Sequence, residues 1–267
     1  MNLSPVAQEA SRELAASLTI PTPALPVGLH LEVPEDVYHQ RQLGVASKSA
    51  LDKIRRSPAH YHAWATCADE DEDTPALRFG RAFHTAVLEP AKYQPAKSTK
   101  KDREDAEAIT GMVASLRAHP IAGRLLSGGH REVTIRWDAG GVPCKGRLDG
   151  YHPELLGGVA FDLKSTTDAS PEEFARSVAR YGYARQEAFY RDGLAALGRA
   201  VPHFLFLVCE KAPPYCAAVY ALSVDAVSRG RVSIVRDLET LAACCASGVF
   251  PGYPDGITTL ELPRWAE

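Results

Sequence analysis

Gly146-Arg147-Leu148-Asp149 and Phe161-Asp162-Leu163-Lys164 are the two segments that decide the predicted fold. Each belongs to an apolar run, 142–148 in the first case and 159–163 in the second, and short runs of this kind are typical of β-strands. Pro153 and Gly157-Gly158 lie between the runs, as expected for a hairpin-like connection. The sequence therefore predicts two neighbouring strands that carry charged residues near their ends.

Alternation along the second strand places its two charged residues on one face. Residues two apart in a strand share a face, so Asp162 and Lys164 are expected to point the same way, with Leu163 in the core. If the strands pair, Asp149 lies beside them. Two carboxylates and an ammonium group suit a hard divalent cation and a water nucleophile, since Mg²⁺ prefers oxygen ligands. The alternative is a solvated, ion-paired strand edge, which is the commoner role of an isolated Asp-x-Lys pair.

Composition indicates an ordinary globular protein. The chain has 267 residues, of which 45% are hydrophobic and 24% charged. We expect a leader over residues 1–28, with an alanine-rich helix over 6–18, and a single domain over 29–267. No secretory signal and no apolar run of roughly 20 residues is present, so we expect a cytoplasmic protein without membrane contact. A net charge of −3 argues against a surface that binds nucleic acid everywhere, but it allows a local basic channel.

Two further residues are candidates for a metal site. His84 lies in a helix expected over 76–88, one turn after Gly80, which leaves space for a ligand or another backbone. The alternative for His84 is a satisfied core histidine. Glu132 lies in a strand expected over 131–137; an exposed strand glutamate is its favoured role, and a place near the metal cluster is the second.

Candidate phosphate contacts lie in two basic segments. Ser47-Lys48-Ser49 begins a helix, and with Arg55 it could hold a DNA phosphate at the helix N-terminus, although simple capping is the favoured role. Lys100 and Lys101 lie in a basic segment expected to be a loop before a helix over 105–118; a solvated loop and a phosphate-contacting loop are evenly matched. The acidic run from Asp69 to Asp73 is expected to be a solvated loop.

A helix expected over 182–197 places Gln186 and Tyr190 one turn apart, where packing is the default role of the tyrosine. The six cysteines show neither a C-x-x-C pair nor a zinc-binding spacing, so buried free thiols are expected.

Taken in order, these motifs resemble the PD-(D/E)xK nuclease superfamily, in particular its RecB-like and phage RecE-type (exonuclease VIII) members. The resemblance extends from about Leu43 to Trp265 and rests on Phe79 to His84, Asp149, Asp162-Leu163-Lys164, and Gln186 with Tyr190. Leu148 stands where the superfamily's name implies proline; RecB-like members often lack that proline. The resemblance implies an α/β fold with a restriction-endonuclease-like core, in which helices flank a mixed central β-sheet.

The resemblance also implies roles for residues. Asp149, Asp162, the Leu163 main-chain carbonyl and His84 would bind Mg²⁺ or Mn²⁺, and Lys164 would position the attacking hydroxide. Gln186 would orient a water or the lysine, and Tyr190 would contact phosphate or the catalytic groups.

The implied activity is exonucleolytic, 5′ to 3′ digestion of double-stranded DNA ends in phage-type recombination or DNA repair, in a bacterial or phage-infected cell. A ring-shaped homo-oligomer and a single-strand annealing protein are the implied partners. The alternatives are a Cas4-like or endonucleolytic enzyme and a catalytically silent DNA-binding recombination protein. No iron–sulfur cluster is expected, because Cys244-Cys245 lacks the third cysteine of a Cas4-type group.

Overall fold

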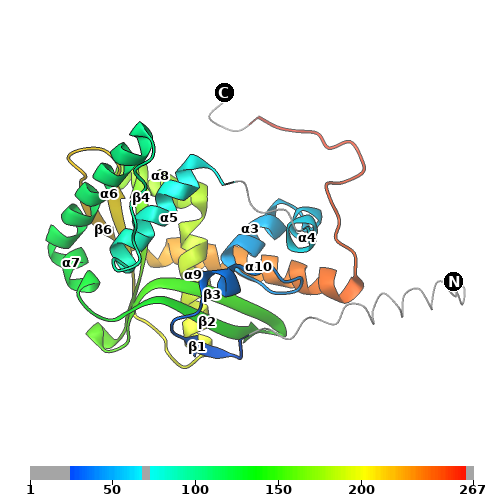
Figure 1. The fold of residues 1–267 in the computed structure, drawn as a ribbon. Helices are drawn as coiled ribbons and strands as arrows, with labels where there is room; N and C mark the ends of the chain where they lie inside the picture. Colours follow the sequence, from blue (N-terminus) through cyan, green and yellow to red (C-terminus); the bar gives the residue numbers. More distant parts are fainter. Residues whose placement is uncertain (1–24, 68–72, 263–267) are drawn as a thin grey trace, which may run out of the picture.

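The computed structural model describes residues 25–67 and 73–262, and a mixed six-stranded sheet lies at its centre (Figure 1). The strands follow the order β1-β2-β3-β4-β5-β6. Pairing is antiparallel throughout except between β4 and β5, which run parallel. The strands are β1 (Gly28–His30), β2 (His130–Ala139), β3 (Val142–His152), β4 (Val159–Thr166), β5 (His203–Glu210) and β6 (Ala217–Tyr220). This arrangement confirms the expected α/β fold with a mixed sheet.

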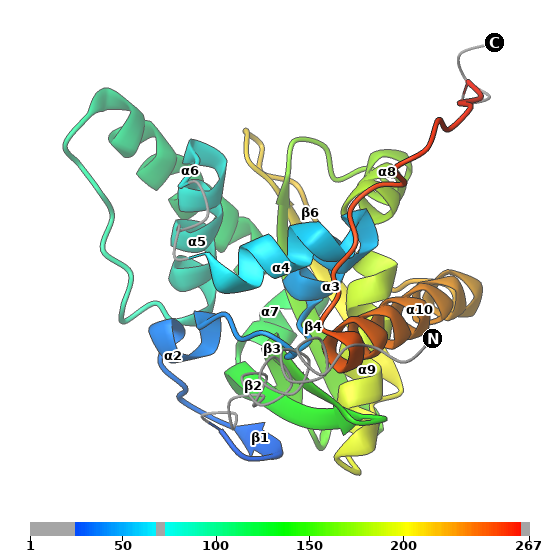
Figure 2. The ribbon, with the colours of Figure 1, turned by 90° about the vertical axis from the view of Figure 1, so that its right-hand side faces the viewer.

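Helices cover both faces of the sheet. Parallel strands need a crossover connection, and α8 (Pro171–Tyr181) and α9 (Tyr183–Ala196) supply it between β4 and β5. Figure 2 shows α5 (Pro75–Leu88) and α6 (Lys100–Ala118) on one side of the sheet and α9 and α10 (Val224–Ser247) on the other. The other helices are α2 (Glu35–His39), α3 (Lys48–Arg56), α4 (Pro58–Thr66) and α7 (Pro120–Leu126). In the described ranges, no helix combines the length and the apolarity needed to cross a bilayer.

The two faces of β4 contribute to two separate apolar clusters. Val159, Phe161 and Leu163 pack against residues of α5, α6 and α7. Ala160 belongs to the opposite cluster, which contains residues of α3, α9 and α10. Because side chains alternate along a strand, Asp162 and Lys164 follow Ala160 onto the α9 side. Leu163 is fully buried, as predicted.

Side-chain caps fix several helix starts, and one of them corrects a prediction. Ser47 caps α3, as expected, and Ser57-Pro58, a sequence typical of a helix start, caps α4 in the same way. The helix predicted from residue 105 begins at Lys100 instead, because Thr99 and Asp102 form a reciprocal capping box. Lys100 and Lys101 therefore lie in the first turn of α6 and not in a loop.

Other differences from the predictions are small. β3 continues past Leu148 to His152. The sequence 215–222 predicts a strand, and the strand observed there is shorter, Ala217–Tyr220. The apolar periodicity of residues 223–246 predicts a helix with Val235 facing the core, but Val235 is 47% exposed on α10. The helix predicted over 6–18 and the acidic residues 69–72 lie outside the described residues. Asp73, which is described, pairs with Arg78 and Arg81 of α5.

Candidate active site

Strands β3 and β4 bring Asp149 next to the Asp162-Leu163-Lys164 segment. Asp149 Oδ2 accepts a hydrogen bond of 2.6 Å from the main-chain N–H of Leu163. The neighbouring residue Gly150 pairs with Phe161, and a Cβ at Gly150 would lie only 2.0 Å from the Phe161 ring. The glycine after Asp149 is thus required for the close approach that joins the two motifs.

Three potential metal ligands converge beside this junction. His84 of α5, Glu132 of β2 and Asp149 of β3 each offer a ligand atom, and these atoms all lie within 4.8 Å of one another. His84 Nδ1 is 3.5 Å from Asp149 Oδ2. The helix predicted for His84 therefore places its imidazole at the carboxylates, and the alternative of a core histidine is not what the geometry shows.

Glu132 reaches this group through an unusual backbone conformation. Its φ is 50°, in the left-handed region that a glutamate rarely adopts. The β2–β3 register joins Arg131 to Gly150 and Val133 to Leu148, so Glu132 and Asp149 lie opposite each other at a break in the ladder. Backbone strain of this kind costs of order 1–3 kcal/mol and tends to concentrate at functional sites. The favoured prediction of an exposed strand glutamate was wrong, because a break in strand pairing cannot be seen in an isolated strand sequence.

The charged forms of the Glu132 and Asp149 carboxyl groups are both destabilised when no cation is bound. Burial, followed by the charge of Asp149, raises the pKa of Glu132 to about 8, and the Arg147 guanidinium opposes the rise. Burial, followed by the charge of Asp162, raises the pKa of Asp149 to about 6, with His84 and Lys164 opposing it. A bound cation would relieve both penalties.

Asp162 takes part in a different set of contacts. Its Oδ2 forms an ion pair of 2.5 Å with Lys164 Nζ, and its Oδ1 accepts a hydrogen bond from Gln186 Nε2. Lys164 Nζ also donates to Gln186 Oε1 at 3.1 Å. The three side chains form a closed network that fixes the ammonium group at the edge of the site. Asp162 is not among the three residues whose ligand atoms converge, so a direct bond from Asp162 or from the Leu163 carbonyl to metal stays a prediction.

Tyr190 packs beneath this network. It is 6% exposed, and burial raises its pKa well above the usual value. A Cβ at Gly146 would lie 2.9 Å from the Tyr190 ring, so the first glycine of the Gly146–Asp149 motif makes room for the tyrosine. Tyr190 also shares side-chain hydrogen bonds with Gln186 and Tyr38, so it contacts the network around Lys164 as well as packing against Gly146; a contact with phosphate stays a prediction.

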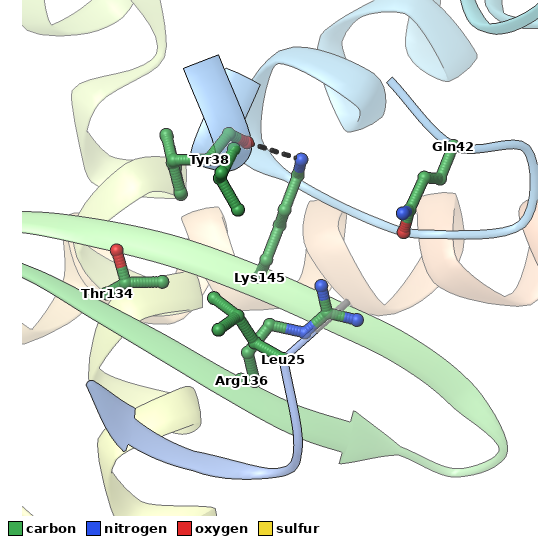
Figure 3. A pocket seen from close by; sticks show the side chains of 7 residues that line it. Leu25, Tyr38, Gln42, Thr134, Arg136 and Lys145 are labelled. Carbon is green, nitrogen blue, oxygen red and sulfur yellow. Dashed lines mark hydrogen bonds between the residues drawn. The ribbon is translucent and has the colours of Figure 1, made fainter. Parts of the chain in front are cut away.

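Tyr38 is a nearby residue that the sequence interpretation missed. Arg147 lies over its ring at 4.2 Å and donates to the Val33 carbonyl at 2.9 Å, while Arg147 Nη1 is 3.7 Å from Glu132. Lys145 Nζ donates to the carbonyl of Tyr38 at 2.6 Å, as Figure 3 shows. The cavity there has room for about one water, so the contact holds α2 against β3 and leaves little space for a ligand. Nothing in the local sequence of 33–40 signals this long-range contact.

The predicted DNA-contacting residues divide into two groups. Ser47 is buried and caps Ala50 N, and Lys48 Nζ donates to Asp52 and to the Tyr181 carbonyl. Ser49 and Arg55 are exposed on the same helix. Lys100 and Lys101 lie on α6, where they form ion pairs with Glu104 and Asp105. These contacts bring neither α6 lysine to the carboxylates, and a DNA-binding role for all six residues stays a prediction.

The donor set fits a divalent cation. The two carboxylates supply the oxygen ligands that Mg²⁺ prefers, and Mn²⁺ accepts the imidazole nitrogen more readily than Mg²⁺ does. Burial raises the pKa of both carboxyl groups, with the charge of Asp149 adding to the rise at Glu132 and that of Asp162 to the rise at Asp149; a bound cation would offset these penalties. His84, Glu132 and Asp149 are therefore the residues that would hold it.

Comparison with known proteins agrees with this architecture. A crystal structure described as a "Putative exonuclease" from Eubacterium rectale superimposes with a TM-score of 0.57 at 14% identity, covering 85% of this chain and 97% of that chain. A second structure, SSO0001, has a TM-score of 0.33 at 11% identity over 90% of this chain and 87% of that chain, which is too low a similarity to indicate a shared fold. No curated protein matches the sequence.

A family model matches residues 47–263, which include every segment of the candidate site except the α2 contact. Its description is a PDDEXK-like domain of unknown function (DUF3799). The chain therefore belongs to this family of PDDEXK-like domains, as the sequence motifs had indicated.

Proposed function

We propose that the protein is a divalent-metal-dependent nuclease that hydrolyses phosphodiester bonds of DNA. One observation carries the proposal: Asp149, Asp162 and Lys164 converge on neighbouring strands, next to His84 and Glu132. Carboxylates around a cation, with an ammonium group alongside, are suited to attack on a phosphodiester by water.

The residues of the chain have distinct parts in this reaction. His84, Glu132 and Asp149 would hold the cation, and Lys164 would orient the attacking water and offset negative charge that develops on the phosphate. Asp162 and Gln186 keep the lysine in place through the network described above. A bound Mg²⁺ or Mn²⁺ supplies a lowered water pKa and Lewis acidity, worth several kcal/mol.

Within this activity we propose exonucleolytic action on duplex DNA ends, with 5′ to 3′ polarity, in recombination or repair. The support is the resemblance to RecE-type nucleases and the description of the E. rectale protein, whose fold this chain shares. Assembly into a ring and cooperation with a single-strand annealing protein belong to the same proposal.

Incubation with linear and closed circular duplex DNA tests the proposal. With Mg²⁺ or Mn²⁺, the wild type should digest only the linear DNA, and EDTA should stop digestion. Opening of the circle would indicate an endonuclease, and cleavage of neither would indicate a binding protein. Asp162→Ala and Lys164→Ala should each reduce digestion by at least about 10²-fold, as expected for loss of a preorganised charged group, while circular dichroism shows a folded protein. Near-wild-type digestion by either variant would refute the assignment.

A further inference from the structure

A second cleft is bordered by Lys164 and is separate from the metal ligands. It has a volume of about 340 Å³ and lies between the end of β4, helix α8 and the residue that follows β5. Lys164 lines it, whereas His84, Glu132, Asp149 and Asp162 do not. We call it the α8 cleft. Because β4 and β5 run parallel, it lies at their carboxyl ends, where open α/β sheets commonly bind ligands.

The lining of the α8 cleft is cationic although the whole chain has a net charge of −3. Lys164, Arg176, Arg180 and Lys211 face one carboxylate, Glu173, which is ion-paired with Arg176. Among the described residues, no carboxylate pairs with Arg180 or Lys211. Arg180 lies over the Tyr181 ring at 5.5 Å and Lys211 over the Phe79 ring at 5.6 Å, but neither has a carboxylate partner in the described part of the chain. The cleft therefore presents two positive charges that no described carboxylate neutralises, beyond the lysine of the proposed active site, and an anion is the ligand that suits it.

Aromatic rings and hydroxyl groups complete the lining. Tyr181 and Tyr183 stack with their ring centroids 5.7 Å apart. Tyr183 is held by stacking on Phe206, and Lys164 Nζ lies 4.4 Å from its ring. Tyr181 is 50% exposed, and the Arg180 guanidinium lies 5.5 Å from its ring centroid, so a stacked base would share this ring with a cation. Ser165 and Thr167 add hydroxyl groups that can donate to phosphate oxygens, whereas the Thr166 hydroxyl donates to the Asp168 carbonyl. Cations along a groove, together with a stacking surface, are the features that bind single-stranded nucleic acid.

We propose that the α8 cleft binds a nucleotide adjoining the scissile phosphate, with its phosphate at Arg180 and Lys211 and its base on Tyr181. The cleft is at the lower end of the ~300–1,000 Å³ range of ligand pockets, which suits about one nucleotide. The inference rests on the proposed nuclease function, because it takes Lys164 as the point where the strand passes the active site. The nucleotide is either part of the uncleaved strand or the released mononucleotide.

Binding of a fluorescent single-stranded oligonucleotide tests this proposal without cleavage. Anisotropy is measured with Ca²⁺ in place of Mg²⁺ over a range of salt concentrations, with a gel to verify that the probe stays intact. Arg180→Gln/Lys211→Gln should weaken binding at least tenfold at low salt and reduce the slope of log K against log[salt] by about 0.7, since one neutralised phosphate on a single strand contributes about 0.7. Tyr181→Ser should weaken binding about tenfold with the salt slope unchanged, because stacking releases no counterions.

Arg236→Gln is the matched control, since Arg236 is an exposed arginine on α10. It should leave affinity and slope unchanged. Mn²⁺ should raise the melting temperature of the wild type and that of every variant by the same amount. A wild-type affinity and salt slope in the double variant would overturn the proposal. If a deoxynucleoside 5′-monophosphate competes with the oligonucleotide in the wild type but not in the double variant, the cleft binds the released nucleotide. If it does not compete, and the variants still weaken oligonucleotide binding, the cleft binds the uncleaved strand.

The outcome is separable from that of the nuclease assay. If the wild type cuts DNA but the double variant binds the oligonucleotide normally, the nuclease proposal is supported and the proposal of nucleotide binding in the α8 cleft is refuted. The opposite result is a wild type that shows no cleavage but whose binding of the oligonucleotide depends on Arg180, Lys211 and Tyr181. In that case the α8 cleft is supported as a binding site and the nuclease proposal is refuted.

Discussion

Glu132→Gln should stabilise the metal-free protein and weaken its response to metal. The substitution keeps the shape of the side chain and removes its charge. Burial and the charge of Asp149 raise the pKa of Glu132 from 4.5 to about 8. The folded protein therefore holds this proton over a pH range in which the unfolded chain has lost it. The stabilisation is full below about pH 4.5 and is lost as the pH rises through about 8.

The size of the effect follows from the geometry. The ligand oxygens of Glu132 and Asp149 are at most 4.8 Å apart, and at an effective dielectric constant of about 20 two such charges repel by about 3.5 kcal/mol. Arg147, 3.7 Å from Glu132, and a side-chain exposure of 24% reduce this value. We expect Glu132→Gln to raise the free energy of unfolding by about 1–3 kcal/mol near pH 8.5 and to leave it nearly unchanged near pH 5.

Urea denaturation in EDTA at the two pH values measures this difference, and Glu239→Gln on the exposed face of α10 is the control for the loss of one negative charge. Repeating the alkaline measurement with Mn²⁺ should reverse the order. The wild type gains free energy from binding, whereas the variant, which lacks one ionised ligand, should bind at least about tenfold more weakly. A destabilised variant in EDTA near pH 8.5, or an equal gain from Mn²⁺ in both proteins, would refute a cation site built on Glu132.

Three further outcomes follow from the same geometry. Gly146→Ala places a methyl group 2.9 Å from the Tyr190 ring, so it should cost about 1–3 kcal/mol of stability by urea denaturation and lower nuclease activity with it; unchanged values would mean that the ring is free to move. Leu163→Ala, at a fully buried position, should cost about 2–5 kcal/mol but retain Mn²⁺ binding by calorimetry, because the side chain faces away from the site; lost binding in a folded variant would contradict this. Because the pKa of Asp149 is raised to about 6, affinity for Mn²⁺ should fall more steeply with acidification below that pH, and a flat profile would count against Asp149 as a ligand.

The Asp162-Leu163-Lys164 motif could be predicted from the sequence because its conformation depends only on neighbouring residues. Alternation along residues 159–166 depends only on strand geometry, so the burial of Leu163 and the shared face of Asp162 and Lys164 could be predicted from the sequence. Helix caps at Ser47 and Ser57 are local in the same sense. The order of motifs that matched the superfamily predicted the mixed sheet.

Contacts between distant segments were decided by the tertiary structure alone. Glu132 joins the cluster because β2 breaks its pairing opposite Asp149, and Tyr38 lies near it because Lys145 and Arg147 hold α2 against β3. The α8 cleft combines residues from β4, α8 and the end of β5, which are separated in sequence. A residue's type and its neighbours along the chain fix its local conformation, but strand register and helix docking depend on the packing of the whole chain. The sequence therefore determined which groups carry charge toward the site, and only the folded structure determined which of them meet.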